Sequence, residues 1–144
     1  MTVQQQSAAT KLTFTDSNST PLTCANDLPV TLNVTDAARD AEVVNETAER
    51  FDRLDVLVNN AGRTQVGALA ETTDAEMRSL FELHYFGPAA LTKAALPHMR
   101  RQGGGWIVQF SSVGGQVTAP GFGACCATKF ALEGLTEMPP REGE

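Results

Sequence analysis

The chain has 144 residues, of which 42% are hydrophobic, and its formal net charge is −6. This length predicts one globular domain with a core, because two such domains would need a longer chain. The acidic balance, with no basic cluster larger than Arg100-Arg101, argues against a nucleic-acid partner and a polybasic membrane surface. The three cysteines and two histidines match neither a disulfide framework nor a zinc pattern, so we expect reduced thiols and no metal.

Residues 1–28 are rich in Gln, Ser, Thr, Asn and Asp and have little apolar periodicity. We expect a poorly structured or irregular segment there, followed by one α/β domain over residues 29–144. No apolar run approaches the length of a membrane span, and the first residues lack the basic and apolar stretches of a signal peptide. We therefore expect a cytoplasmic protein that does not bind membranes.

Residues 29–34 (PVTLNV) have the apolar alternation of a short strand, and Thr35 is a suitable N-cap for a following helix. Apolar residues then recur three or four positions apart, which predicts one buried helical face. This face comprises Ala37, Ala41, Val44, Ala48 and Phe51. The opposite, polar face would include Asp40, Glu42, Glu46, Glu49 and Arg50.

The next apolar run, LDVLV at residues 54–58, is too short for a helix and is typical of a strand covered on both faces. Thr73 and Glu76 have the spacing of a capping box, which predicts that a helix begins there. The helical pattern is interrupted at Gly87-Pro88 and then continues until the glycines that begin at Gly103.

Residues 106–110 (WIVQF) predict another buried strand, which runs into Ser111-Ser112. Strands that alternate with long helices indicate βαβ units and a parallel sheet. In such sheets ligands bind beyond the carboxyl ends of the strands. We therefore expect a binding crevice at residues 59–62 and 111–115.

Three motifs in this order resemble those of the short-chain dehydrogenase/reductase family: LDVLVNNAG at 54–62, WIVQFSSVGG at 106–115 and CCATKFALEGL at 125–135. The resemblance extends over residues 29–137 and implies a partial Rossmann-like three-layer fold, with a parallel sheet flanked by helices. It also implies NAD or NADP as cofactor, and hydride transfer between the nicotinamide and a small alcohol or carbonyl substrate.

The resemblance also implies roles for four residues at the catalytic centre. Ser112 matches the serine that hydrogen-bonds the substrate oxygen, and Lys129 matches the lysine that holds the nicotinamide ribose. Cys125 stands where the family has its acid/base tyrosine, which that lysine activates. His84 stands where the family usually has an asparagine that supports a proton-relay water.

For the cofactor, Asn59, Ala61 and Gly62 match the family's loop beside the adenosine part of the dinucleotide. Asn33 stands where a cofactor-facing aspartate is common in the family. Cofactor preference between NAD and NADP is normally decided at the end of a strand that this sequence does not reveal.

The sequence departs from the family at several positions. No glycine precedes Gly62, so the glycine-rich turn that binds the pyrophosphate cannot exist in its usual form. A thiol at Cys125 is shorter than a phenol and should not reach the substrate, and the single tyrosine, Tyr85, has no lysine four residues later. The chain ends at Glu144, so elements that usually complete the sheet are missing, and we expect uncovered apolar surface, exposed edges and association.

Each of these residues also has a purely structural interpretation. Ser112 could cap a turn at a strand end, and Lys129 could be a solvated helix residue. Cys125 and its neighbour Cys126 could be small packing residues, since free cysteine behaves as a buried hydrophobe. For His84 the alternative is chemical: it could form a thiolate–imidazolium pair with Cys125 and not support a water.

Three functions therefore stay open. The chain could be a truncated, catalytically impaired member of the family, which the missing tyrosine and glycine turn favour. It could be an active oxidoreductase with an altered site formed by Ser112, Cys125 and Lys129. It could also be a non-catalytic interaction partner that forms a homo-oligomer or joins a full-length relative through its two long helices.

Overall fold

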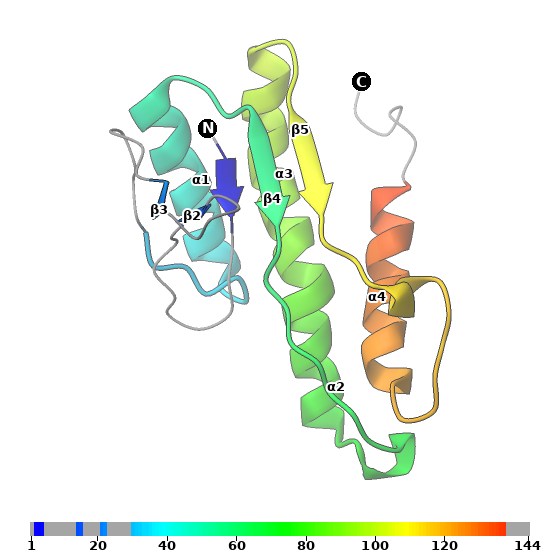
Figure 1. The fold of residues 1–144 in the computed structure, drawn as a ribbon. Helices are drawn as coiled ribbons and strands as arrows, with labels where there is room; N and C mark the ends of the chain where they lie inside the picture. Colours follow the sequence, from blue (N-terminus) through cyan, green and yellow to red (C-terminus); the bar gives the residue numbers. More distant parts are fainter. Residues whose placement is uncertain (1, 5–13, 16–20, 23–29, 138–144) are drawn as a thin grey trace.

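The computed structural model describes residues 2–4, 14–15, 21–22 and 30–137 (Figure 1). Its main sheet is parallel and has the order β1-β4-β5. The three strands are β1 (Thr2–Gln4), β4 (Val56–Asn59) and β5 (Trp106–Gln109). A separate antiparallel pair consists of β2 (Phe14–Thr15) and β3 (Pro21–Leu22).

The helices of the described chain alternate with β4 and β5, as βαβ units require. They are α1 (Ala37–Phe51), α2 (Asp74–Phe81), α3 (Gly87–Arg101) and α4 (Gly123–Thr136). A π-helical turn, η2 (Glu82–Phe86), joins α2 to α3, and two 3₁₀ turns occur at η1 (Leu69–Glu71) and η3 (Val113–Gly115). The predicted α/β class, with a parallel sheet flanked by helices, is confirmed.

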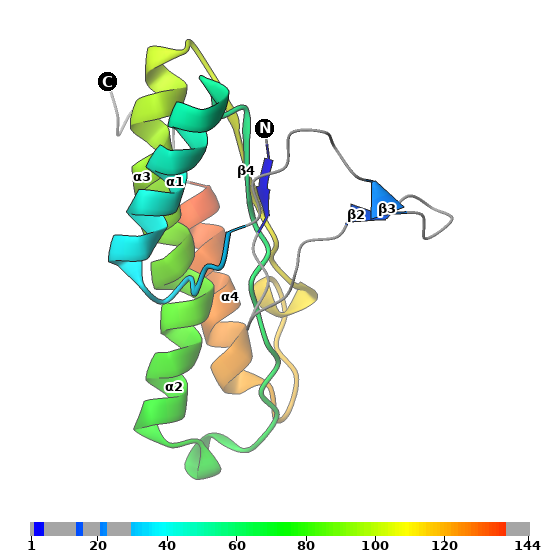
Figure 2. The same ribbon diagram turned by 90° about the vertical axis from the view of Figure 1, so that its left-hand side faces the viewer.

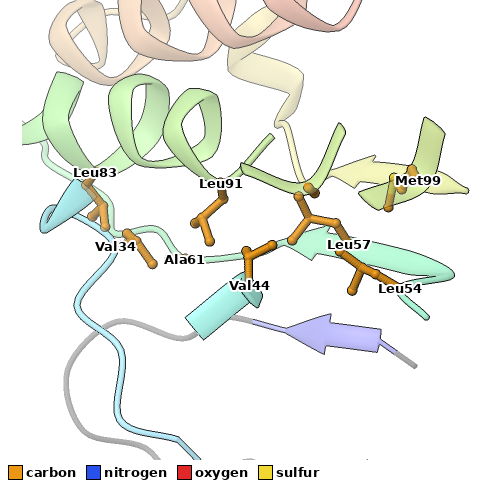
Figure 3. Packing of buried hydrophobic residues seen from close by; sticks show 9 residues of the cluster. Val34, Val44, Leu54, Leu57, Ala61, Leu83, Leu91 and Met99 are labelled. Carbon is orange, nitrogen blue, oxygen red and sulfur yellow. The ribbon is translucent and has the colours of Figure 1, made fainter. Parts of the chain in front are cut away.

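The core lies between the sheet and the helices. Figure 3 shows this cluster between α1, α3 and β4; its buried members are Val34, Val44, Leu54, Leu57, Ala61, Leu83, Leu91, Ala95 and Met99. Among residues 30–137, none of the helices combines the length and apolar character that a membrane span requires.

The helices all lie on one side of the sheet (Figure 2). Side chains alternate across a strand, so Ile107 and Gln109 of β5 are partly covered while Trp106 and Val108 are exposed. Trp106 is 75% exposed and Phe110, which follows the strand, is 50% exposed. The strand predicted at 106–110 is thus present. Its expected burial is wrong for one face, where Trp106 and Val108 are exposed. This exposed face confirms the expectation of uncovered apolar surface.

The strand predicted at residues 29–34 is wrong for the described part, residues 30–34, which form no strand. Asn33 directs a local turn instead: its side-chain oxygen accepts hydrogen bonds from the backbone N–H and the hydroxyl of Thr35. Asp36, and not Thr35, caps α1 by accepting from the backbone N–H of Arg39 at 3.2 Å. Asparagine and aspartate compete with strand pairing in this way through side-chain to backbone hydrogen bonds.

The buried face of α1 is also shifted from its predicted position. Its buried residues are Asp40, Val43, Val44, Thr47 and Ala48. Asp40, which the sequence places on the polar face, is fully buried, whereas Ala37 is exposed. The packing of α1 against α3, and not the apolar spacing alone, therefore decides which face is covered.

The capping box at the start of α2 is confirmed. The Thr73 hydroxyl accepts from the backbone N–H of Glu76, and the Glu76 carboxylate accepts from the backbone N–H of Thr73 at 2.8 Å. The predicted interruption at Gly87-Pro88 is wrong, because the helix continues through η2. There the Gly87 N–H donates to the oxygen of Glu82, five residues earlier, and Pro88 stands near the start of α3, where a missing N–H is tolerated.

Candidate functional site

Lys129 joins α4 to the carboxyl end of β5. Its ammonium nitrogen donates a hydrogen bond of 2.8 Å to the backbone oxygen of Phe110, and the residue is 9% exposed. Burial lowers the pKa of Lys129, and the nearby Cys125 and Glu133 partly oppose this shift. The sequence expectation of a solvated lysine does not describe this side chain, which is directed into the junction of α4 and β5.

Ser112 lies at the same junction, directly after β5. Ser112 is exposed, and its hydroxyl accepts a hydrogen bond of 3.1 Å from the backbone N–H of Gly114, the second residue of the turn η3. This turn packs against α4, since a Cβ on Gly114 would stand 3.1 Å from the sulfur of Cys126. The hydroxyl can thus serve both as a cap for η3 and as a donor to an external group.

Two adjacent cysteines, Cys125 and Cys126, lie near the start of α4. Cys125 is a half-buried free thiol one helical turn before Lys129, so the two residues share a helical face. Cys126 is buried beside η3, and its thiol lies 3.8 Å from the backbone oxygen of Val117. Cys126 is therefore a packing residue, and Cys125 is the more accessible thiol of the two, at the position where the family resemblance expects an acid/base tyrosine.

His84 lies behind this junction, on η2, and is 1% exposed. Its Nδ1 lies 2.8 Å from the Thr128 hydroxyl, and its Nε2 accepts a hydrogen bond of 3.2 Å from the backbone N–H of Arg63. Both ring nitrogens are engaged in these contacts, and no hydrogen bond joins His84 to Cys125 in the described part of the chain. Burial, with the positive charges of Lys129 and Arg63, lowers the pKa of His84 to about 4, so the imidazole is neutral near pH 7.

The residues predicted to bind the cofactor have structural contacts of their own. Asn59 is buried at the end of β4; its amide donates to the Gln109 side chain at 2.9 Å, and its backbone oxygen accepts from Phe110. Ala61 belongs to the hydrophobic core. Gly62 is exposed, and a Cβ there would stand 3.5 Å from Nε2 of His84.

Asn33 lies in the segment before α1, where its side-chain oxygen is bonded to Thr35 as described above. The following residue, Val34, contacts Gly87 at the start of α3. This places Asn33 beside the junction of η2 and α3, where it is exposed.

Sequence reasoning missed Thr128, which is fully buried and connects His84 to the turn of α4 that contains Cys125. Its hydroxyl donates a hydrogen bond of 2.7 Å to the backbone oxygen of Cys125 and also lies next to His84. The available signal was its position directly before Lys129, on the helical face that turns inward. Polar residues on such a face are the ones that hydrogen-bond to neighbouring elements.

The residues of this junction fit a dinucleotide only in part. The loop after β4 and Lys129 both lie near His84: Gly62 and Arg63 lie against its ring, and the charge of Lys129 acts on it. A pyrophosphate is bound by backbone N–H groups at the N-terminus of a helix, yet within the described residues no helix begins between β1 and α1. No glycine precedes Gly62 either, so the phosphate-binding part of the site does not fit. The described residues contain no group of three or more potential metal ligands.

The comparisons with known proteins place these features in a family. The chain matches the family model for short chain dehydrogenase over residues 6–143. It is 42% identical over 102 residues to an uncharacterized oxidoreductase of Thermotoga maritima, covering 70% of this chain and 41% of that protein. It is 38% identical to dehydrogenase/reductase SDR family member 7B of Bos taurus, covering 80% of this chain and 35% of that protein.

Solved structures agree with these relatives. A short-chain dehydrogenase from Streptomyces avermitilis superposes with a TM-score of 0.73 at 57% identity, over 75% of this chain and 40% of that chain. ElxO with NADP bound superposes with a TM-score of 0.71 at 36% identity, over 74% of this chain and 43% of that chain. The present chain therefore spans less than half the length of these matched proteins.

Proposed function

Because the chain belongs to the short-chain dehydrogenase family, whose members are oxidoreductases, we propose that it keeps the family's active-site junction in a catalytically impaired form. The observation that supports this most directly is Cys125 at the acid/base position, one helical turn before Lys129. Support also comes from Ser112, which follows β5, and from Lys129, which reaches the end of β5 from α4. The group that would move the proton differs.

The impairment has a geometric cause. A general acid or base contributes roughly 10²- to 10⁴-fold, and only within hydrogen-bond reach of the proton that it moves. A cysteine sulfur lies one bond from Cβ, whereas a tyrosine oxygen lies beyond a whole ring. The Cys125 thiol therefore stops short of a substrate oxygen bound by Ser112.

Cofactor binding is impaired for a separate reason. The solved relatives include proteins bound to NADP, and the loop after β4 and Lys129 are the residues of this chain that would contact NADP or NAD. No glycine turn precedes Gly62, so the described residues offer no cluster of backbone N–H groups that could bind the pyrophosphate of the cofactor. We expect these remaining contacts to give weak or no binding, whichever alcohol or carbonyl compound serves as substrate.

An assay of carbonyl reduction with NADPH tests this function. Wild type, Cys125→Tyr and the matched control Cys125→Phe, which adds the same ring without the hydroxyl, should all show no turnover above the background without protein. Turnover by the wild type that Cys125→Ala abolishes would support the alternative of an active, altered site. Turnover by Cys125→Tyr alone would show that the cofactor still binds productively, and would contradict the proposal that cofactor binding is impaired.

The uncovered face of the sheet favours a second candidate function, self-association. Trp106, Val108 and Phe110 are exposed, and their alternate spacing puts them on one face of the chain along β5, opposite Ile107, which packs against the core. The helices lie on one side of the sheet (Figure 2). Parallel sheets are normally covered on both faces, and exposed apolar patches mark interaction surfaces. We propose that a second copy of the chain covers this face, and the variant that tests this is given in the Discussion.

A further inference from the structure

Three hydrogen bonds in series connect the loop after β4 to the first turn of α4. The backbone N–H of Arg63 donates to Nε2 of His84 at 3.2 Å, and Nδ1 of His84 lies 2.8 Å from the Thr128 hydroxyl. The Thr128 hydroxyl donates to the backbone oxygen of Cys125 at 2.7 Å. The loop that matches the cofactor site is thereby joined to the helical turn that contains the acid/base position.

The directions of these bonds determine where the imidazole proton resides. Arg63 N–H can only donate, so Nε2 must carry a lone pair. The single proton of the Thr128 hydroxyl is used on the Cys125 oxygen, so this hydroxyl must accept from Nδ1. Every polar group in the series is satisfied only if His84 is neutral and protonated on Nδ1.

The surroundings of His84 agree with a neutral ring. His84 is 1% exposed, and the charged groups that act on it, Lys129 on α4 and Arg63 on the loop, are both positive. An imidazolium would also place an N–H on Nε2 directly opposite the Arg63 N–H. Two donors would then face each other in a buried position, which is unfavourable.

The π-helical turn explains how His84 reaches this position. Within η2 the consecutive residues Leu83 and His84 are both buried, although neighbours in an α-helix point about 100° apart. Leu83 joins the hydrophobic core with Val34 and Leu91 (Figure 3), while His84 contacts α4. The wider π-helical turn lets the same helix pack against the core on one side and against α4 on the other. Such turns often occur at functional sites.

We propose that His84 is a positioning residue: as a neutral, Nδ1-protonated imidazole, it fixes the loop after β4 against the helical turn that carries Cys125 and Lys129. It does not relay protons, because both its nitrogens are occupied by fixed partners. Thr128 acts with it, because its hydroxyl accepts a hydrogen bond from His84 and donates one to the Cys125 backbone oxygen.

This inference deepens the proposed function and rests on it in one respect, namely that the junction is the family's active site. The two fail separately. Saturable binding of NADPH would contradict the impaired function and leave the His84 geometry unchanged. A different tautomer of His84 would contradict the positioning role and leave the cofactor result unchanged.

The deciding experiment is a long-range ¹H–¹⁵N correlation spectrum of the wild-type chain at neutral pH, which distinguishes the two neutral tautomers of each histidine. We expect His84 to be protonated on Nδ1. His98 is an internal control with the opposite tautomer, because its Nε2 lies 2.7 Å from the Asn45 side-chain oxygen and its Nδ1 accepts from Arg101. An Nε2-protonated or doubly protonated His84 would overturn the proposal.

A pair of variants tests the series itself through amide hydrogen exchange of Arg63. Thr128→Val is nearly isosteric and removes the hydroxyl, whereas Thr128→Ser keeps it. We expect about fivefold to tenfold faster exchange at Arg63 in Thr128→Val, the effect of weakening one hydrogen bond, with wild-type exchange in Thr128→Ser. Equal exchange in both variants would show that Thr128 does not hold His84 in place. If Thr128→Val does not fold, the wild-type tautomer alone decides.

Discussion

Gly87 lies against the backbone oxygen of Val34, so closely that a Cβ at position 87 would overlap this oxygen. The contact brings the segment before α1 to the junction of η2 and α3. It therefore places Asn33, the residue expected to face the cofactor, beside the helix that carries His84. Only glycine permits this approach at position 87.

We predict that Gly87→Ala lowers the free energy of unfolding by about 1–3 kcal/mol, the usual cost of forced overpacking. The obstacle is backbone, which cannot move aside as a flexible side chain can. Gly134→Ala is the matched control, because Gly134 lies within α4 and no atom is near a Cβ there. It should raise stability by about 0.5–1 kcal/mol. Urea denaturation measures both, and an unchanged or more stable Gly87→Ala would contradict the contact.

Asp40 is a buried carboxylate without a partner. It is fully buried on α1, and neither of its carboxylate oxygens has a hydrogen bond. Burial, with a smaller contribution from the neighbouring Asp36, raises the pKa of Asp40 from 3.8 to about 7. Replacing it by the similarly sized valine should stabilise the fold by about 1–3 kcal/mol above pH 7.

The pH dependence provides the control for Asp40→Val. A carboxyl group whose pKa is raised in the folded state binds more protons there than in the unfolded state. The free energy of unfolding therefore falls as pH rises between 3.8 and about 7. The gain from Asp40→Val should therefore be smallest near pH 4 and reach its full size above pH 7. A gain that is the same at both pH values would mean that the charge of Asp40 is not the cause.

His84 should produce the opposite slope. Its pKa is lowered from 6.5 to about 4, so the unfolded state binds more protons between these values and stability rises with pH through this window. In the wild type, Asp40 and His84 oppose each other there. In Asp40→Val the rise should become visible, and in the double variant Asp40→Val/His84→Gln it should disappear. A rise that persists in the double variant would assign it to other groups.

The exposed sheet face should cause association that depends on concentration. Trp106→Lys places a charge at the most exposed of the three apolar residues of this face and should shift the sedimentation of the chain toward monomer. Val113→Lys is the matched control, because Val113 is 77% exposed but belongs to η3 and not to a strand of the sheet. If the wild type is a monomer at all concentrations, or if both variants behave alike, this face is not the interface.

The sequence predicted the parts of this fold that depend on local pattern. The strand that ends at Asn59 and the strand before Ser112 follow from apolar runs, and the helix with Lys129 follows from the family's motif. The structure brings Lys129 to the residues that follow β5. The segment around Asn33 was predicted wrongly, because apolar alternation there competes with a side-chain turn that only the hydrogen bonds reveal.

Buried polar residues were the other limit of sequence reasoning. Asp40 and Thr128 are charged or hydroxylated, and pattern alone assigns such residues to a solvent face. Their burial depends on which helix packs against them. His84 was recognised as a site residue, but its partners Thr128 and Arg63 come from distant parts of the chain. The missing glycine turn, in contrast, was visible from composition alone.

The central claim is that this chain keeps the family's active-site junction without a working cofactor site, and titration with NADPH followed by nicotinamide fluorescence tests it most directly. The chain should first be shown to be folded by a cooperative melt. We predict no saturable change in fluorescence up to millimolar NADPH, for the wild type and for Cys125→Tyr alike. A saturable change in the wild type would show that the pyrophosphate is bound without the glycine turn, and would contradict the account.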